Sequence, residues 1–206
     1  MIERMLKATA QGARDTRQRI VEAAFETLRA NGFAGTSARS IARVGGFNQA
    51  LIFYHFGSVN DLLIAALDWS AKQRMTRYRE ALTGIDDLPR LMDAAASLYK
   101  EDAESGHTTV LAELFAASLA VPGLAAQLTA RMEPWIAFTE ELLRKSFGRL
   151  PLGGLVDVRA AAQATLAMYL GIDLLVHAEG DLSRADSIFE EARRLGRAFH
   201  PLPEGT

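Results

Sequence analysis

Residues 36–63 have the sequence TSARSIARVGGFNQALIFYHFGSVNDLL, and this stretch decides the fold of the chain. Its pattern predicts two short helices joined by a tight turn at residues 45–47, followed by a longer helix that Ser58 caps. The second short helix, at residues 48–56, carries exposed polar and aromatic side chains. Two short helices joined in this way place one of them in the major groove of double-stranded DNA. The stretch therefore predicts a helix-turn-helix DNA-binding motif.

The second short helix has one side suited to packing and another suited to reading bases. Ile52 and Phe56 are four residues apart and are expected to point inward. Asn48 and Gln49 are at the N-terminus of the helix, the end that usually enters the groove. A glutamine can pair with adenine, and an apolar side chain can contact the methyl group of thymine. The cations expected to reach the DNA backbone are Arg17 and Arg39.

Charge is divided unevenly along the 206 residues. Residues 1–60 hold eight basic and four acidic side chains, a charge of +4. The whole chain has a net charge of −2, so the remainder carries −6. A basic head on an acidic body indicates that only the head meets a polyanion.

Composition excludes several other classes of protein. The chain has no cysteine, so disulfides and thiolate metal sites are excluded, and a reducing cytoplasm is compatible. The N-terminus lacks the apolar core of a signal peptide. The longest apolar run, residues 160–178, is interrupted by Gln163, Asp173 and His177, and we expect no membrane span. The histidines are scattered, and no nucleophile or phosphate-loop motif is present. We therefore predict that the chain is not an enzyme and that it binds no cofactor.

Apolar periodicity predicts an all-α fold of about nine helices. We expect residues 1–14 to form a loose arm and Asp15 to cap the first helix, which ends near Asn31. The helix at residues 58–83 joins head to body, and its later charged residues, including Arg74, are expected to lie in solvent. We divide the chain into a DNA-binding domain, residues 1–57, and a helical ligand-binding and dimerisation domain, residues 58–206.

Further helices are expected in the body. Pro134 should kink or split one of them, because proline lacks the backbone donor. The acidic cluster of Glu101, Asp102 and Glu104 indicates a solvated helix end. A loop is expected at residues 148–154. The predicted helices of the body are residues 88–104, 108–120, 123–147, 157–179 and 183–200.

A set of residues at fixed spacing resembles the N-terminal domain of TetR-family transcriptional regulators. The resemblance covers residues 15–63 and implies a cytoplasmic homodimer in which a small ligand, bound in the C-terminal domain, releases DNA; most members are repressors. The residues that carry it are Arg17, Ile20, Ala23, Ala24, Phe33, Thr36, Ser37, Ile41, Ala42, Gly46, Phe53, Tyr54, His55, Phe56 and Leu62. By matching positions it implies DNA contacts from Arg39, Asn48, Gln49, Ala50, Leu51, Phe53, Tyr54 and His55.

Three positions depart from the pattern of that family. Phe53 replaces a usual tyrosine and Val59 a common lysine, so two possible phosphate contacts are lost. Gly45 replaces a usual alanine and is expected to loosen the turn. Fewer phosphate contacts should lower affinity for DNA and flatten its salt dependence.

Two further sets of residues suggest how the body works. Small residues recur on one predicted helix and apolar residues on the last, a pattern that suits a four-helix bundle between two chains, although both faces could instead pack inside one subunit. These predicted interface residues are Ala160, Ala164, Ala167, Gly171, Ile188, Ala192, Leu195 and Phe199. The candidate lining of a ligand cavity, which could equally be plain core, is Met92, Tyr99, Phe115, Trp135, Phe138, Met168 and Tyr169, with Asp173 or His177 as the polar contact.

The sequence thus predicts a homodimeric repressor that a hydrophobic small molecule releases from a pseudo-palindromic operator. The alternative is a helical ligand carrier or protein-interaction module whose head has lost its affinity for DNA, which the residues at positions 53 and 59 favour.

Overall fold

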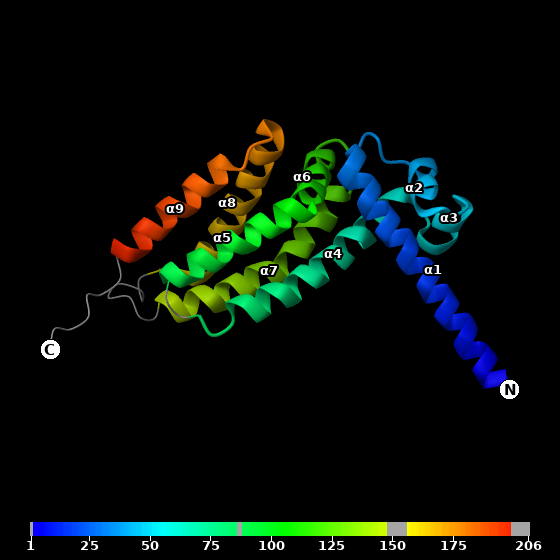
Figure 1. Cartoon of the computed structure of the whole chain (residues 1–206), viewed down its shortest axis with the longest axis horizontal. Helices are drawn as coiled ribbons and strands as arrows, with labels where there is room; N and C mark the ends of the chain where they lie inside the picture. The colour runs from blue at the N-terminus through cyan, green and yellow to red at the C-terminus, as the bar shows by residue number, and fades with distance from the viewer. Residues whose placement is uncertain (1, 86–87, 148–155, 199–206) are drawn as a thin grey trace.

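The computed structural model describes residues 2–85, 88–147 and 156–198, with the backbone alone described for residues 2–11, 13, 147, 195, 196 and 198. In these ranges every regular element is a helix, which confirms the all-α prediction (Figure 1). We call α1–α3 the head and α4–α9 the body. The helices are α1 Ile2–Asn31, α2 Ala38–Gly45, α3 Ala50–Phe56, α4 Val59–Leu82, α5 Leu88–Ser105, α6 His107–Ser118, α7 Leu124–Phe147, α8 Val158–Glu179 and α9 Ser183–Ala198.

Local side-chain bonds set the ends of the head helices. The hydroxyl of Ser37 accepts from the backbone N–H of Ser40 at 3.1 Å, and the Ser40 hydroxyl accepts in return from the backbone N–H of Ser37 at 2.8 Å. Gly46 ends α2 in the left-handed conformation, with φ of +66°, which glycine adopts without strain. Asn48 Oδ1 then accepts from the N–H of Ala50 at 2.9 Å, so α3 begins two residues later than predicted.

The predicted start of the first helix was wrong. α1 begins at Ile2, and Asp15 lies within it. Residues 2–14 contain no proline, and their only residue of very low helix propensity is Gly12, so nothing in them stops the helix. In Figure 1 the N-terminal part of α1 projects beyond the rest of the head.

The bounds of the connecting helix α4 were predicted correctly, but the solvent exposure of its later residues was not. Ser58 caps it by accepting from the N–H of Asp61 at 3.0 Å, and Thr83 follows its last residue. Arg74, predicted to lie in solvent, is only 5% exposed. It shares one side of the helix with Tyr78 and Leu82, at steps of four residues, and this side is buried in the body. The helix therefore stays packed along its length.

The body helices confirm most of the predicted boundaries. α7 runs unbroken through Pro134, so the predicted split did not occur. Buried Leu128 and Phe138 on either side hold the helix in place, and one lost backbone bond is not enough to divide it. Asp157 caps α8 by accepting from two backbone N–H groups at 3.0 and 3.1 Å. The loop predicted at residues 148–154 lies outside the described residues.

Head and body share a hydrophobic core. Leu28 of α1, Leu63 of α4 and Leu114 of α6 belong to one buried cluster. Phe25 of α1 contacts Trp69 of α4, with ring centroids 5.6 Å apart, and His107 of α6, at 5.1 Å. A movement of α4 or α6 in the body would therefore act directly on the head.

Candidate DNA-binding head and ligand cavity

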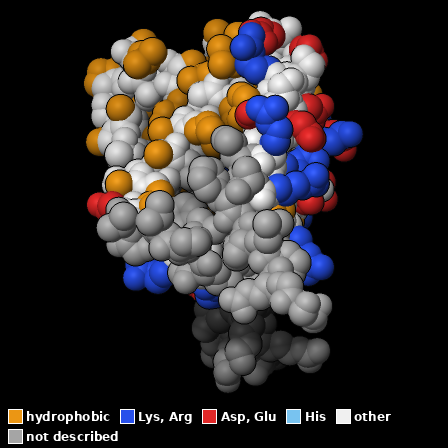
Figure 2. All heavy atoms as spheres, turned by 90° about the vertical axis from the view of Figure 1, so that its left-hand side faces the viewer, with side chains coloured by type: hydrophobic (Ala, Val, Ile, Leu, Met, Phe, Trp, Pro, Cys, Tyr) orange, Lys and Arg blue, Asp and Glu red, His pale blue; other side chains and the backbone are white. Residues whose placement is uncertain are grey.

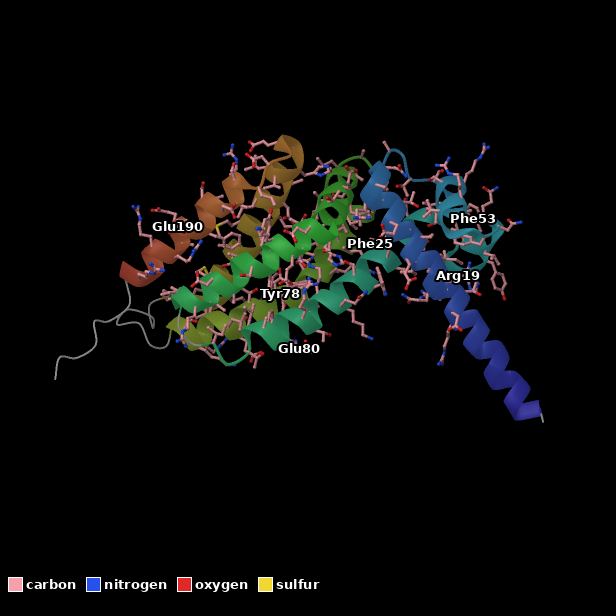
Figure 3. The ribbon with its side chains drawn as sticks, viewed as in Figure 1. Arg19, Phe25, Phe53, Tyr78, Glu80 and Glu190 are labelled. Carbon is pink, nitrogen blue, oxygen red and sulfur yellow. The ribbon has the colours of Figure 1, made fainter. Side chains whose placement is uncertain are left out.

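α3 presents its polar and aromatic side chains outward. Ile52 is fully buried and seats the helix, whereas Phe53 is 51% and Tyr54 82% exposed. Figure 3 shows Phe53 at the end of the molecule remote from most of the body. The predicted contacts Asn48, Gln49 and Ala50 are all exposed, at the N-terminal end of the helix.

Other predicted contact residues lie deeper or to the side. Leu51 is half-buried against the core of the head, and the half-buried His55 packs its ring against Tyr54 at 4.9 Å. Arg17 is exposed, with its guanidinium 4.6 Å from the centre of the Phe56 ring, and Arg39 is exposed on α2. The geometry thus leaves the start of α3 and these two cations free to meet a polyanion.

The expectation that Gly45 loosens the turn was wrong. A Cβ atom at this position would lie 2.1 Å from Cε1 of Phe47 and 2.9 Å from the Cβ of Ala23. The space that a side chain would occupy is therefore filled by the Phe47 ring. Glycine is required for this close approach, and the turn is tightly packed.

The body contains a largely apolar cavity of about 160 Å³, lined by residues of all six helices α4 to α9. It brings together five of the nine predicted ligand-binding residues. Predicted interface residues Ile188 and Ala192 line it too, so at least part of the inward face of α9 serves the cavity. The five residues are Met92, Trp135, Phe138, Met168 and Tyr169.

The remaining four predicted ligand-binding residues lie elsewhere. Tyr99 is buried beside Tyr169 and Phe189, and Phe115 packs against the core shared by head and body. Asp173 and His177 line a second pocket of about 270 Å³, formed by residues of α5, α6 and α8 and the turn before α9.

A buried ionic network at the cavity was missed by the sequence analysis. Arg74 Nε donates to Asp102 Oδ2 at 2.6 Å, and its Nη2 donates to the Tyr169 hydroxyl at 2.6 Å. Asp102 also accepts from Arg77 and, at 2.9 Å, from Tyr78. The predicted solvated helix end was therefore wrong for Asp102, which is fully buried. Spacing could have revealed this, because Arg74 lies four residues before Tyr78 on a helix face whose other buried residues are uncharged.

Burial controls the ionisation of the polar groups around this network. It raises the pKa of the Tyr78 and Tyr169 phenols well above the ordinary value, so both stay neutral; Tyr78 donates to Asp102, and Tyr169 accepts from Arg74. Burial and the nearby Arg74 charge lower the pKa of His107 to about 4, and its Nδ1 lies 2.6 Å from the Ser70 hydroxyl. His107 is therefore neutral at physiological pH.

The outer face of α8 is exposed and apolar. Ala160, Ala164 and Ala167 are exposed, and a Cβ at Gly171 would meet nothing within 4 Å. Met168, Leu174 and Leu175 are each more than 40% exposed. Figure 2, which views the molecule from the side opposite the head, shows hydrophobic side chains gathered on one side and charged ones on the other. Of the other predicted interface residues, the Leu195 side chain and Phe199 lie outside the described part.

By length and composition alone, α8 is long and apolar enough to cross a membrane. α3 and α4 meet the same criterion of length and composition only when taken together, and they are bent by 69° relative to each other. Only 17% of the apolar window of α8 is buried within the chain. α8 carries the buried Asp173 and also His177, whose Nε2 lies 3.0 Å from Glu113 Oε1 of α6, and such polar groups make a lipid environment costly.

The chain resembles known regulators in sequence. Residues 20–66 match the family described as "Bacterial regulatory proteins, tetR family". Over 183 residues, 89% of this chain and 92% of the relative, it is 24% identical to the HTH-type transcriptional regulator UidR of Escherichia coli (strain K12). It is 36% identical over 63 residues, 31% of this chain and 47% of the relative, to the uncharacterized HTH-type transcriptional regulator TtgW of Pseudomonas putida.

The fold is shared with solved structures. Salmonella enterica GusR superposes with a TM-score of 0.70 and 24% identity, covering 90% of this chain and 95% of that one. A TetR-family regulator from Agrobacterium tumefaciens gives a TM-score of 0.74 and 21% identity, covering 92% and 100%. Fold and head together define a helix-turn-helix transcriptional regulator. Its head matches the TetR family of these regulators, and most of the chain is similar in sequence to one such regulator.

Proposed function

We propose that this regulator is a cytoplasmic, homodimeric repressor that binds a pseudo-palindromic operator through α3 and leaves it when a hydrophobic small molecule enters the apolar cavity. The observation that carries the proposal is the free face of α3, where Gln49 and Ala50 are exposed beside Phe53 and Tyr54. Aromatic side chains this large and this exposed on a seven-residue helix suit a binding surface.

The proposed reading of DNA follows from side-chain chemistry. Gln49 can bond adenine in two places, and Ala50 and Phe53 can contact thymine methyl groups. Arg17 and Arg39 supply phosphate contacts, with Asn48 and Tyr54 at the edges of the groove. Leu51 and His55, which are half-buried, would support the helix more than they touch bases.

The exposed face of α8 supports a dimer. Small side chains at Ala160, Ala164, Ala167 and Gly171 allow another helix to approach closely, while Leu174 and Leu175 supply apolar area. α9 would complete a four-helix bundle, as the predicted interface residues on it suggest. Two heads related by a twofold axis suit the two half-sites of a pseudo-palindrome. Formation of the bundle would also remove the apolar face of α8 from water.

The cavity lies where a ligand can influence the head. Its walls include Leu67, Arg74, Tyr78 and Leu82 of α4, the helix that follows α3 directly. An apolar or aromatic ligand packed on Trp135 and Phe138 would favour one tilt of α4, and operator DNA another. The ligand can act only through its different affinity for these two arrangements.

Fluorescence anisotropy with DNA from the intergenic regions flanking the gene tests the proposed reading of DNA. We expect a specific site with a steep salt dependence, and Gln49→Ala should weaken binding to that site more than binding to unrelated DNA. Gln127→Ala, an exposed glutamine on α7, is the matched control and should change neither. Equal losses on all sequences would reject a base-reading role, and no specific site at low salt would favour a carrier or protein-interaction module instead.

Sedimentation velocity tests the proposed dimer. Ala164→Glu should convert the dimer to a monomer, because a charge would be buried at the centre of the bundle. Ala126→Glu, at an exposed position on α7, should leave the dimer intact. A wild-type monomer at micromolar concentration, or a dimer unaffected by the change at Ala164, would contradict the assignment.

A further inference from the structure

Arg74 is a buried cation on the wall of the apolar cavity. It is 5% exposed and lines the cavity from α4. Its guanidinium carbon lies 5.0 Å from the centre of the Trp135 ring and 5.7 Å from the centres of the Tyr78 and Tyr169 rings, and all three of these residues line the cavity too. Figure 3 shows Tyr78 among the body helices, well apart from Phe53 of the head. The charged end of Arg74 therefore lies at the cavity.

The guanidinium of Arg74 has more donors than the protein has acceptors for it. A guanidinium carries five N–H groups. Nε donates to Asp102 and Nη2 donates to the Tyr169 hydroxyl, each at 2.6 Å. The Tyr78 hydroxyl acts on Arg74 electrostatically, and it donates its own proton to Asp102. Nη1 makes no hydrogen bond with a described residue and, unlike Nε of Arg77, it is not closed off from the surrounding space. A charged donor in this position calls for an acceptor from a ligand.

Positive charge exceeds negative charge around this donor. Asp102 accepts from both Arg74 and Arg77, so two guanidinium groups share one fully buried carboxylate. Glu101 approaches Arg77 at 3.6 Å, but its side chain is 56% exposed, so water screens its charge. An anion that approaches Nη1 of Arg74 would therefore meet a net attraction.

The other charged groups near the cavity do not supply that anion. Asp68 and Arg131 line the cavity as well, but they bond each other twice, at 2.6 and 2.9 Å. The carboxyl of Asp173 on α8 interacts electrostatically with Arg74, yet burial raises its pKa to about 7, so it is partly protonated at neutral pH. The anion that completes the site must come from the ligand.

The shape and the remaining walls of the cavity indicate what the anion is attached to. Trp135, Phe138 and Met168 supply apolar surface. The cavity volume of about 160 Å³ is close to the roughly 150 Å³ that is enough to hold a benzene ring. The planar guanidinium matches a carboxylate in geometry and bonds it more strongly than it bonds a neutral acceptor.

We propose that this cavity binds a small aromatic carboxylate as its effector. The carboxylate accepts from Nη1 of Arg74, and the ring packs on Trp135 and Phe138. The inference rests on the proposed function, because it names the class of ligand for the cavity assigned there to the effector. Arg74 belongs to α4, which follows α3 directly, so the ionic contact is made with the helix that joins head and body.

Isothermal titration calorimetry of the full chain with benzoate, benzamide and benzamidinium tests the class of ligand, because the three probes are nearly equal in shape and differ in charge. We expect one saturable site per chain for benzoate, at least about tenfold weaker binding of benzamide, and no measurable binding of benzamidinium. Either of the other probes binding as tightly as benzoate would overturn the proposal, and so would the absence of benzoate binding at millimolar concentration.

A paired substitution, Arg74→Met with Asp102→Asn, tests whether Arg74 is the partner of the carboxylate. Changing both residues avoids leaving a buried carboxylate without its cation, and the probe series in wild type tests the proposal even if this variant does not fold. The variant should bind benzoate at least about tenfold more weakly than wild type and benzamide within about threefold of wild type. Arg144→Met, which removes an exposed arginine of α7 paired with Glu140, is the control and should bind benzoate like wild type. Unchanged benzoate affinity in the paired variant would overturn the assignment to Arg74.

Calorimetry involves no DNA, so the class of ligand and the proposed function can fail separately. Benzoate should also release the chain from its specific site in the anisotropy assay. Benzoate that binds at Arg74 but leaves DNA binding unchanged would reject the release mechanism and keep the carboxylate site. Release by neutral apolar molecules, without any binding of benzoate, would reject the carboxylate class and keep the repressor.

Discussion

Replacing Asp173 by asparagine should remove a large part of the pH dependence of stability. Burial raises the pKa of this carboxyl from 3.8 to about 7, with Arg74 opposing the shift. A raised folded pKa means that the folded chain holds the proton more tightly than the unfolded chain. The stabilisation is complete below pH 3.8 and is lost as the pH rises through 7.

The size of the effect follows from the shift. At about 1.4 kcal/mol for each pKa unit, a shift of roughly three units corresponds to about 4 kcal/mol in all. Roughly 2 to 3 kcal/mol of this is lost between pH 5 and pH 8. Asp173 is almost wholly buried, so solvent screening reduces this free energy little. Relaxation of the surrounding side chains would lower it, so 2 to 3 kcal/mol is roughly an upper value.

Urea unfolding at pH 5, 6, 7 and 8, at one protein concentration, measures the effect. Between pH 5 and pH 8 the wild-type protein should lose roughly 2 to 3 kcal/mol of unfolding free energy that Asp173→Asn does not lose. The difference between the two proteins should therefore shift in favour of Asp173→Asn as the pH rises. His107, whose pKa burial lowers from 6.5 to about 4, makes stability depend on pH mainly between those values, and it does so in both proteins, so its contribution cancels. The control is Asp181→Asn, because the Ser183 hydroxyl lowers the pKa of that exposed carboxyl and its titration lies below this window. Parallel pH profiles for wild type and Asp173→Asn would refute the reasoning.

Three further changes test other parts of the structure. Asp102→Ala leaves the buried Arg74 without its carboxylate partner and should lower the free energy of unfolding by roughly 3 to 5 kcal/mol in the same urea assay. The control, Glu101→Ala at an exposed position, should change it by less than about 0.5 kcal/mol. Gly45→Ala should lower the free energy of unfolding by roughly 1 to 3 kcal/mol, because the new Cβ meets the Phe47 ring. The loss should be smaller when Phe47 is already replaced by alanine. A Gly45→Ala variant as stable as wild type would contradict the observed packing. Trp135→Ala should weaken binding of an apolar fluorescent dye to the cavity at least tenfold, measured by titration, and an unchanged affinity would place the dye elsewhere.

The sequence was sufficient for the features that depend on neighbouring residues. The Ser37 cap, the left-handed Gly46 and the Asn48 bond to Ala50 are local, and their residue types alone indicate helix ends. The same holds for the Ser58 and Asp157 caps. Together with the apolar spacing, they determined the all-α fold and the outward position of the start of α3.

Only the tertiary structure decided the environments of groups whose partners are distant in sequence. Arg74 was expected in solvent because it lies in a run of charges, but Asp102 and Tyr169, 28 and 95 residues away, make its burial possible. Gly45 was expected to be loose because nothing in a turn sequence reveals where the Phe47 ring will lie. Asp173 and His177 were expected beside an apolar ligand, but the packing of α5 and α6 against α8 places them in a separate pocket. Helix ends depend on local hydrogen bonds, whereas burial and charge depend on which helices meet.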